Sequence, residues 1–163
     1  MKTQPRLGID FGGVIVPMVS RTGGEDTQFT DRFLTRPPQA NAVQSIRGLV
    51  EAFDGLVWIV SKAGPRTESL TRQWIAAQDF LGDTGLNEDH LRFCRERQDK
   101  QPICSELGIT HFVDDRVHIM QILQETVSNL YLFGDKSRNR GAKRWTTLVA
   151  DWTEAYEAIT GSL

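Results

Sequence analysis

Residues 7–15 read Leu-Gly-Ile-Asp-Phe-Gly-Gly-Val-Ile, and this stretch decides the fold. Leu7–Ile9 predicts a short buried strand, and Asp10 follows it directly. Gly12 and Gly13 then predict a tight turn. A carboxylate between a buried strand and a glycine turn lies at the carboxyl end of the strand, which is where open α/β sheets bind ligands. We therefore expect functional side chains at this edge.

Strand-like and helix-like segments alternate along the rest of the chain. Short apolar runs predict further strands at Leu56–Val60, Leu91–Cys94, His111–Val113 and Leu130–Phe133. Helical spacing of apolar residues predicts helices between them, and a long C-terminal helix from Trp145 through Leu148, Val149, Trp152, Tyr156 and Ile159. This order predicts an α/β fold with three Rossmann-like layers, in which helices cover both faces of a central parallel sheet.

Length and composition indicate one soluble domain. The chain has 163 residues and a formal net charge of −2, which argues against a globally basic nucleic-acid-binding protein. We expect a single domain over residues 1–163, with residues 17–39 as a loop or small flap and a minimal or absent cap. The sequence shows neither the roughly 18 apolar residues of a membrane helix nor a signal region, and Cys94 and Cys104 form no disulfide framework. We therefore expect a cytoplasmic protein that does not act on membranes.

Polar residues that suit metal and phosphate chemistry follow the predicted strands. These residues are Asp10, Ser61-Lys62, Asp114-Asp115 and Gly134-Asp135. Carboxylates grouped at one edge can bind Mg²⁺, which prefers oxygen ligands and contacts substrate phosphate. A serine hydroxyl at the start of a helix can receive phosphate oxygens, as Ser61 would before the helix that Gly64-Pro65 opens.

In order and spacing, these stretches resemble the four motifs of the haloacid dehalogenase (HAD) superfamily. Residues 7–15 resemble the first motif, Val57–Ser61 the second, Lys100 the third and Phe112–Arg116 the fourth. The Asp-Asp-Arg sequence of the fourth motif is most similar to the deoxyribonucleotidase-type branch. The resemblance covers roughly residues 6–135 and implies a HAD-like fold.

The same resemblance implies a Mg²⁺-dependent phosphohydrolase that acts on a phosphate monoester. Asp10 would be the nucleophile that forms an aspartyl-phosphate, and Lys100 would neutralise charge on Asp10 and on the phosphate. Ser61 and Lys62 would bind the phosphoryl group. The implied Mg²⁺ ligands are Asp10, the backbone carbonyl of Gly12, Asp114 and Asp115.

One position departs from the family pattern. Gly12 stands where the family's phosphatases usually carry a second Asp, which protonates the leaving group and then activates water. General acid–base catalysis contributes roughly 10²–10⁴-fold, so its absence predicts slow ester hydrolysis. Three accounts of the missing Asp stay open. The substrate can have a leaving group that departs without a proton, or Glu25, Asp26 or His118 can supply the proton. In the third account, the chain has lost catalysis. In the last case the chain would bind metal and a phosphorylated ligand in a binding or regulatory role. Dehalogenation or carbon–phosphorus cleavage on the same scaffold is a further alternative.

Several residues have simpler interpretations. Lys62 and Arg97 compete with Lys100 for the role of the third motif, and Asp114-Asp115 can instead cap the helix that follows. Five cations after the last predicted strand form either a solvated loop or a basic lip that attracts an anionic substrate; they are Lys136, Arg138, Arg140, Lys143 and Arg144. The segment lacks interleaved aromatic residues for stacking bases. We therefore favour a phosphorylated small molecule or a nucleotide over a nucleic-acid end.

Overall fold

The computed structural model describes residues 3–17 and 31–163, and its centre is a six-stranded sheet. The spatial order of the strands is β3-β2-β1-β4-β5-β6, and all neighbours are parallel. The strands are β1 (Leu7–Ile9), β2 (Val57–Lys62), β3 (Leu91–Cys94), β4 (His111–Asp114), β5 (Asn129–Phe133) and β6 (Thr147–Val149). The predicted parallel α/β fold is confirmed.

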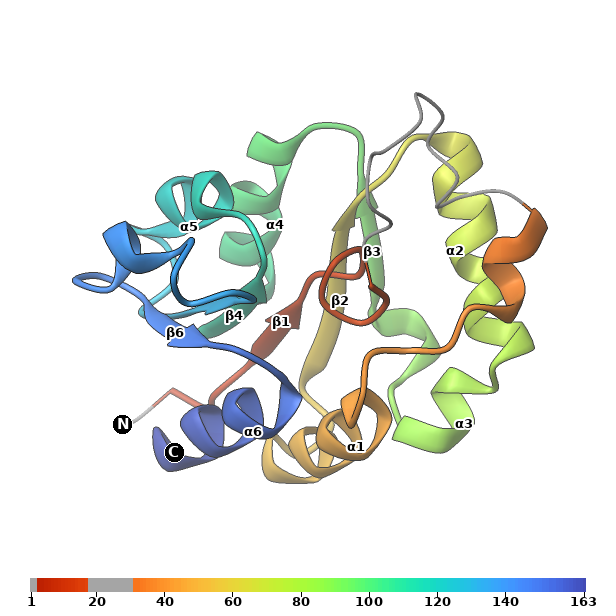
Figure 1. Ribbon diagram of the computed structural model, residues 1–163, viewed down its shortest axis with the longest axis horizontal. Helices are drawn as coiled ribbons and strands as arrows, with labels where there is room; N and C mark the ends of the chain where they lie inside the picture. The colour runs from red at the N-terminus through yellow and green to blue at the C-terminus, as the bar shows by residue number, and fades with distance from the viewer. Residues whose placement is uncertain (1–2, 18–30) are drawn as a thin grey trace.

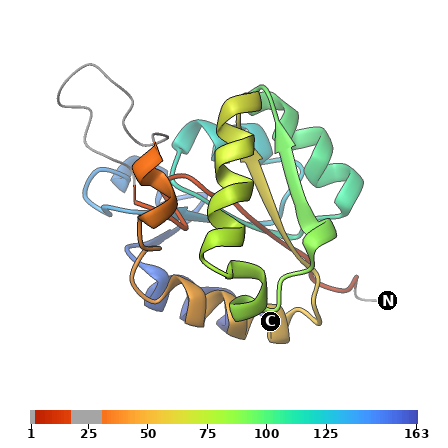
Figure 2. The same ribbon diagram turned by 90° about the vertical axis from the view of Figure 1, so that its right-hand side faces the viewer.

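Helices cover both faces of this sheet and make the three layers (Figure 1). One face carries α1 (Ala42–Ala52), α2 (Pro65–Ala77), α3 (Phe80–Thr84) and α6 (Trp152–Gly161). The other carries α4 (Lys100–Leu107) and α5 (Val117–Leu123). Short 3-10 helices lie at Asp31–Thr35, Glu88–His90, Arg97–Asp99 and Arg140–Ala142. Figure 2 faces the β3 edge of the sheet, with α2 beside it.

Two contacts fix the central strand and the loop that follows it. Gly8 of β1 leaves room for the Phe112 ring of β4, because a Cβ at Gly8 would lie only 2.5 Å from Phe112 Cδ2. Beyond the strand, the Phe11 ring packs edge-on against Trp74 of α2 with 5.3 Å between ring centroids. Asp10 lies between these two contacts, so packing on both sides holds its backbone in place.

The C-terminal region differs from the prediction of one long helix from Trp145. Leu148 and Val149 belong to β6, which pairs with β5. The strand predicted at Leu130–Phe133 is therefore not the last strand of the sheet. The helix α6 begins after Asp151, whose side chain accepts a hydrogen bond from the Glu154 backbone N–H. Helical spacing at Leu148 and Val149 was misleading because pairing with β5 outweighs it. The predicted turn-rich connection after α2 also contains the short helix α3.

Only part of the predicted flap lies in the described chain. Pro17 and residues 31–39 are described, and the segment around Arg36 packs against α2, where Trp74 Nε1 donates to the Arg36 carbonyl at 2.9 Å. Residues 18–30 lie outside the described residues, so the flap stays a prediction. Within residues 3–17 and 31–163, none of the helices has the length and apolar character needed to cross a bilayer.

Candidate active site

Three carboxylates meet at the carboxyl edge of the two central strands. Asp10 follows β1, Asp114 ends β4, and Asp115 comes next along the chain. Gly8 pairs with Phe112 in register, so Asp10 stands opposite Asp114 and both side chains point to the same face of the sheet. One carboxylate oxygen from each of the three residues lies within 4.8 Å of the other two. The structure therefore brings together the carboxylates that sequence analysis selected.

Lys100 is the cation that contacts this cluster. Its Nζ lies 3.0 Å from Asp10 Oδ1 and 2.8 Å from Asp114 Oδ2, and its side chain is 2 % exposed. Lys100 is the first residue of α4 and reaches the cluster over the Phe112 ring. Lys62 is exposed at the end of β2, and Arg97 makes no ion pair with Asp10 or Asp114. Of the three cations that sequence analysis weighed, the structure places Lys100 against the carboxylates.

The negative charge of the three carboxylates in the cluster exceeds the positive charge of Lys100. The three ionised carboxylates carry −3 and Lys100 carries +1, which leaves −2. Burial and the neighbouring Asp114 charge raise the pKa of Asp10 to about 6, although Lys100 opposes the shift. Burial and the charges of Asp10 and Asp114 raise the pKa of Asp115 to about 8. Burial would lower the pKa of Lys100, but the two carboxylates beside it raise that pKa well above the ordinary value.

These residues fit a Mg²⁺ ion. Asp115 Oδ1 is buried without a hydrogen-bond partner, and none of the described residues donates to the Gly12 carbonyl. One oxygen from each of the three carboxylates lies within 4.8 Å of the other two, and Mg²⁺ usually keeps several waters, so a carboxylate can bind the ion directly or through a water. A divalent cation would also balance the charge of −2. Neither aspartate side chain caps α5, whose N-cap is Arg116, so the capping alternative for Asp114-Asp115 is wrong.

Mg²⁺ is expected to stabilise the protein more at about pH 8 than at about pH 5. The folded pKa values of Asp10 and Asp115 lie above the unfolded value of 3.8. The folded protein therefore binds more protons than the unfolded chain, and metal-free stability falls as pH rises from about 4 to about 8. Mg²⁺ relieves the repulsion between the ionised carboxylates but competes with protons at low pH. The measurement is the melting temperature with and without excess MgCl₂ at both pH values. Asp115→Asn should reduce the Mg²⁺ effect, and an equal Mg²⁺ effect at both pH values would contradict the assignment.

The predicted phosphate-binding residues lie on the strand next to Asp10. Ile9 pairs with Ile59, so Ser61 stands one residue beyond Asp10 at the same edge of the sheet. Ser61 is buried, whereas Lys62 is exposed. The chain then passes through Ala63 and Gly64 into α2, which begins with Pro65 as predicted.

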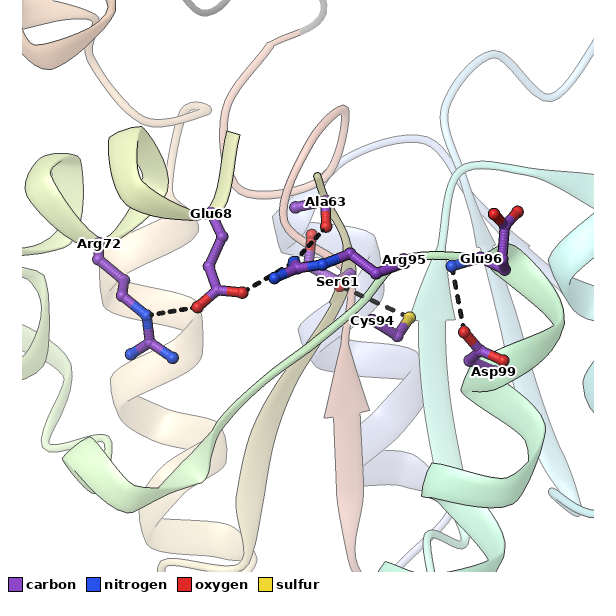
Figure 3. Close-up of polar contacts among 8 residues, drawn as sticks. All are labelled: Ser61, Ala63, Glu68, Arg72, Cys94, Arg95, Glu96 and Asp99. Atoms are coloured by element: carbon purple, nitrogen blue, oxygen red, sulfur yellow. Dashed lines mark hydrogen bonds and ion pairs between the residues drawn. The ribbon is translucent and has the colours of Figure 1, made fainter. Parts of the chain in front are cut away.

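Hydrogen bonds from β3 and the loop after it hold the segment that follows Ser61 (Figure 3). Arg95 Nη1 donates to the Ala63 carbonyl at 2.7 Å and to Glu68 Oε1 of α2 at 2.9 Å. The Ala63 backbone N–H donates to the Cys94 carbonyl, and the Cys94 thiol lies 3.7 Å from the Ser61 carbonyl. Sequence analysis missed Arg95, which belongs to a charged stretch with no local signal for a partner 27 residues away.

The other candidates lie apart from the carboxylates. Asp135 is exposed and accepts hydrogen bonds from Ser137, so it does not join the cluster. His118 is exposed on α5 and makes no hydrogen bond or ion pair with the three carboxylates. Glu25 and Asp26 lie outside the described residues. Of the three proton donors that the sequence suggested, His118 is the one within the described residues, and it does not take the place of the acid that Gly12 lacks.

Comparisons with known proteins support the fold. No family model matches the sequence, and no curated protein matches it. Among solved structures, a crystal structure described as a haloacid dehalogenase-like hydrolase from Burkholderia xenovorans is similar, with a TM-score of 0.55 and 13% sequence identity. The match covers 79% of this chain and 60% of that one, so this chain spans less than two thirds of its length. At this identity the likeness is one of fold. The chain has an α/β Rossmann-like fold of the HAD type, and the deoxyribonucleotidase-type branch stays a prediction.

Proposed function

We propose that the chain is a Mg²⁺-dependent phosphohydrolase that cleaves a phosphate monoester through an aspartyl-phosphate on Asp10. The observation that carries this proposal is the buried cluster of three carboxylates and one lysine, whose formal charge is −2 when all three carboxylates are ionised, at the carboxyl edge of a parallel sheet. Ligands of such sheets bind at this edge, and phosphoryl transfer depends mainly on positioned charge there.

The proposed reaction has two steps, and four side chains of the site take part in them. A carboxylate oxygen of Asp10 attacks phosphorus, the bond from phosphorus to the leaving oxygen breaks, and that oxygen keeps the electron pair and takes a proton from water. Water then attacks the phosphorus of the aspartyl-phosphate, its bond to Asp10 breaks, and inorganic phosphate leaves. Lys100 keeps Asp10 ionised and offsets charge on the transferred group, while Ser61 donates to a phosphoryl oxygen and Lys62 adds an exposed cation. Bound Mg²⁺, held by the three aspartates and the Gly12 carbonyl, would stabilise charge on the phosphoryl oxygens.

Hydrolysis of p-nitrophenyl phosphate with MgCl₂ and with a chelator tests the proposal. Nitrophenolate leaves readily without protonation, so the missing acid should not prevent this reaction. We expect turnover that requires Mg²⁺. A panel of sugar phosphates, nucleotides and phosphorylated oligonucleotides then defines the substrate class. Absence of product from the whole panel under long incubation would contradict the proposal.

The second candidate function is a binding or regulatory domain without turnover, which Gly12 favours. This alternative predicts that phosphate or a nucleotide raises the melting temperature only when Mg²⁺ is present, with no product formed. Turnover that Asp10→Asn abolishes would exclude it.

Gly12→Asp is expected to raise kcat on alkyl phosphates by up to roughly 100-fold, because alkoxide leaving groups need a proton. Gly12 is not among the glycines with a positive φ, so its backbone accepts a side chain. Turnover of p-nitrophenyl phosphate should change little. The control is Gly161→Asp, since a Cβ at Gly161 meets open space. No gain on any alkyl phosphate would show that the missing acid does not limit turnover.

A further inference from the structure

A cavity of about 310 Å³ opens beside the carboxylate cluster, next to Asp115. The loops after β1, β4, β5 and β6 and the segment before α1 form its walls, and the lining residues that matter here are Gly13, Asp115, Gly134, Arg138, Asp151 and Trp152. Gly13 belongs to the turn that follows Asp10, so the cavity adjoins the site on the side away from Ser61. Its volume is at the lower end of the range for small-molecule sites.

Arg138 gives this cavity a positive charge that is free to bind a ligand. Of the five cations in the segment after β5, Arg138 is the one that lines the cavity. Lys136 of the same segment instead pairs with Glu154 at 2.7 Å. The Arg138 guanidinium makes no hydrogen bond or ion pair with any residue in the described parts of the chain, although its charge, after the hydrogen bonds from Ser137, helps to lower the pKa of the exposed Asp135.

Arg138 is the one cation among the described lining residues, and the carboxylates that line the cavity are Asp115, which belongs to the cluster, and Asp151. Asp151 is already engaged as the N-cap of α6, where its Oδ1 accepts from the Glu154 N–H at 2.9 Å. Phe133 and Trp152 provide apolar surface. A guanidinium binds carboxylate or phosphate through paired, charge-assisted hydrogen bonds. The cavity therefore suits a short organic group with a negative charge at its far end.

We propose that this cavity receives the leaving group of the substrate and that Arg138 binds a second anionic group on it, a carboxylate or a second phosphate. The inference rests on the proposed function, since the phosphate being cleaved must lie at Asp10. It narrows the substrate class to small phosphate monoesters with two anionic groups. A nucleoside monophosphate fits less well, because its leaving group is an uncharged nucleoside.

Calorimetric binding in the presence of Mg²⁺ tests this inference in the Asp10→Asn variant, which cannot consume the ligands. The ligands are 3-phosphoglycerate, 1,3-propanediol bisphosphate and, as the form without a second anion, glycerol 3-phosphate. We expect at least one of the first two to bind about tenfold more tightly than glycerol 3-phosphate, the effect of one charge-assisted hydrogen bond. Comparing 3-phosphoglycerate with 1,3-propanediol bisphosphate distinguishes a carboxylate from a second phosphate.

When Arg138→Gln is combined with Asp10→Asn, the preference for ligands with a second anionic group over glycerol 3-phosphate should disappear. The control is Arg144→Gln, which should retain this preference, because Arg144 is an exposed cation of the same segment that does not line the cavity. In the protein with Asp10 intact, the same preference is measured as the ratio of kcat/KM values for these substrates. Equal affinities for all three ligands, binding of none, or a preference that survives Arg138→Gln would overturn the inference. If the protein hydrolyses phosphate monoesters but shows no preference for a second anionic group, this inference alone is overturned. If the preference exists and depends on Arg138 but no ligand is hydrolysed, only the proposed function is overturned.

Discussion

Asp10→Asn is expected to lower kcat for p-nitrophenyl phosphate by roughly 10³- to 10⁶-fold, the range for loss of a catalytic nucleophile. An amide oxygen does not attack phosphorus at a useful rate, although asparagine keeps the size of the aspartate. The fold should survive, because Lys100 still contacts Asp114 at 2.8 Å and the substitution removes one of three crowded carboxylates. The measurement is kcat with excess Mg²⁺, together with the melting temperature of the metal-free protein.

Asp135→Asn is the matched control for this change. Asp135 also follows a strand at the carboxyl edge of the sheet, but it is exposed and hydrogen-bonded to Ser137 rather than to the cluster. Its substitution should leave turnover of p-nitrophenyl phosphate within a small factor of the original. If Asp10→Asn keeps full activity, or if both variants lose activity equally, Asp10 is not the nucleophile.

Lys100→Met is expected to lower the free energy of unfolding of the metal-free protein by about 3–5 kcal/mol, the cost of removing one partner from a buried ion pair. For a chain of this length, that is a fall in melting temperature of roughly 10 °C. Asp10 and Asp114 would remain buried without the ammonium group that now lies within 3.0 Å of both. The loss should be larger at about pH 8 than at about pH 5, because protonation of Asp10 and Asp115 relieves the repulsion.

Thermal unfolding of Lys100→Met beside Lys62→Met checks this prediction. Lys62 is exposed, so its loss should move the melting temperature little. Mg²⁺ should restore part of the stability of Lys100→Met, since it supplies positive charge to the same carboxylates. Equal melting temperatures for the two variants would mean that Lys100 does not neutralise the cluster.

Sequence reasoning found the carboxylate cluster because its signals are local. A short apolar run followed by Asp marks a strand end at Asp10 and again at Asp114. Parallel strands then bring their carboxyl ends to one edge, whatever lies between them in the chain. The loop network of Arg95 has no such signal, and the sequence offered Arg138 only as one of five cations that form either a solvated loop or a basic lip. Both depend on how loops from different parts of the chain meet, and neither residue differs in its sequence surroundings from a solvated arginine.

The alternation of strands and helices, with an acid at two strand ends, was enough to determine the parallel sheet and the three carboxylates, since strand direction alone brings those ends together. Tertiary packing decided the rest. Burial of α4 against the sheet selected Lys100 over Lys62 and Arg97, because only a cation held there reaches both Asp10 and Asp114. Pairing with β5 made Leu148 and Val149 a strand, because the hydrogen bonds of an edge strand come from a neighbour that local periodicity does not reveal.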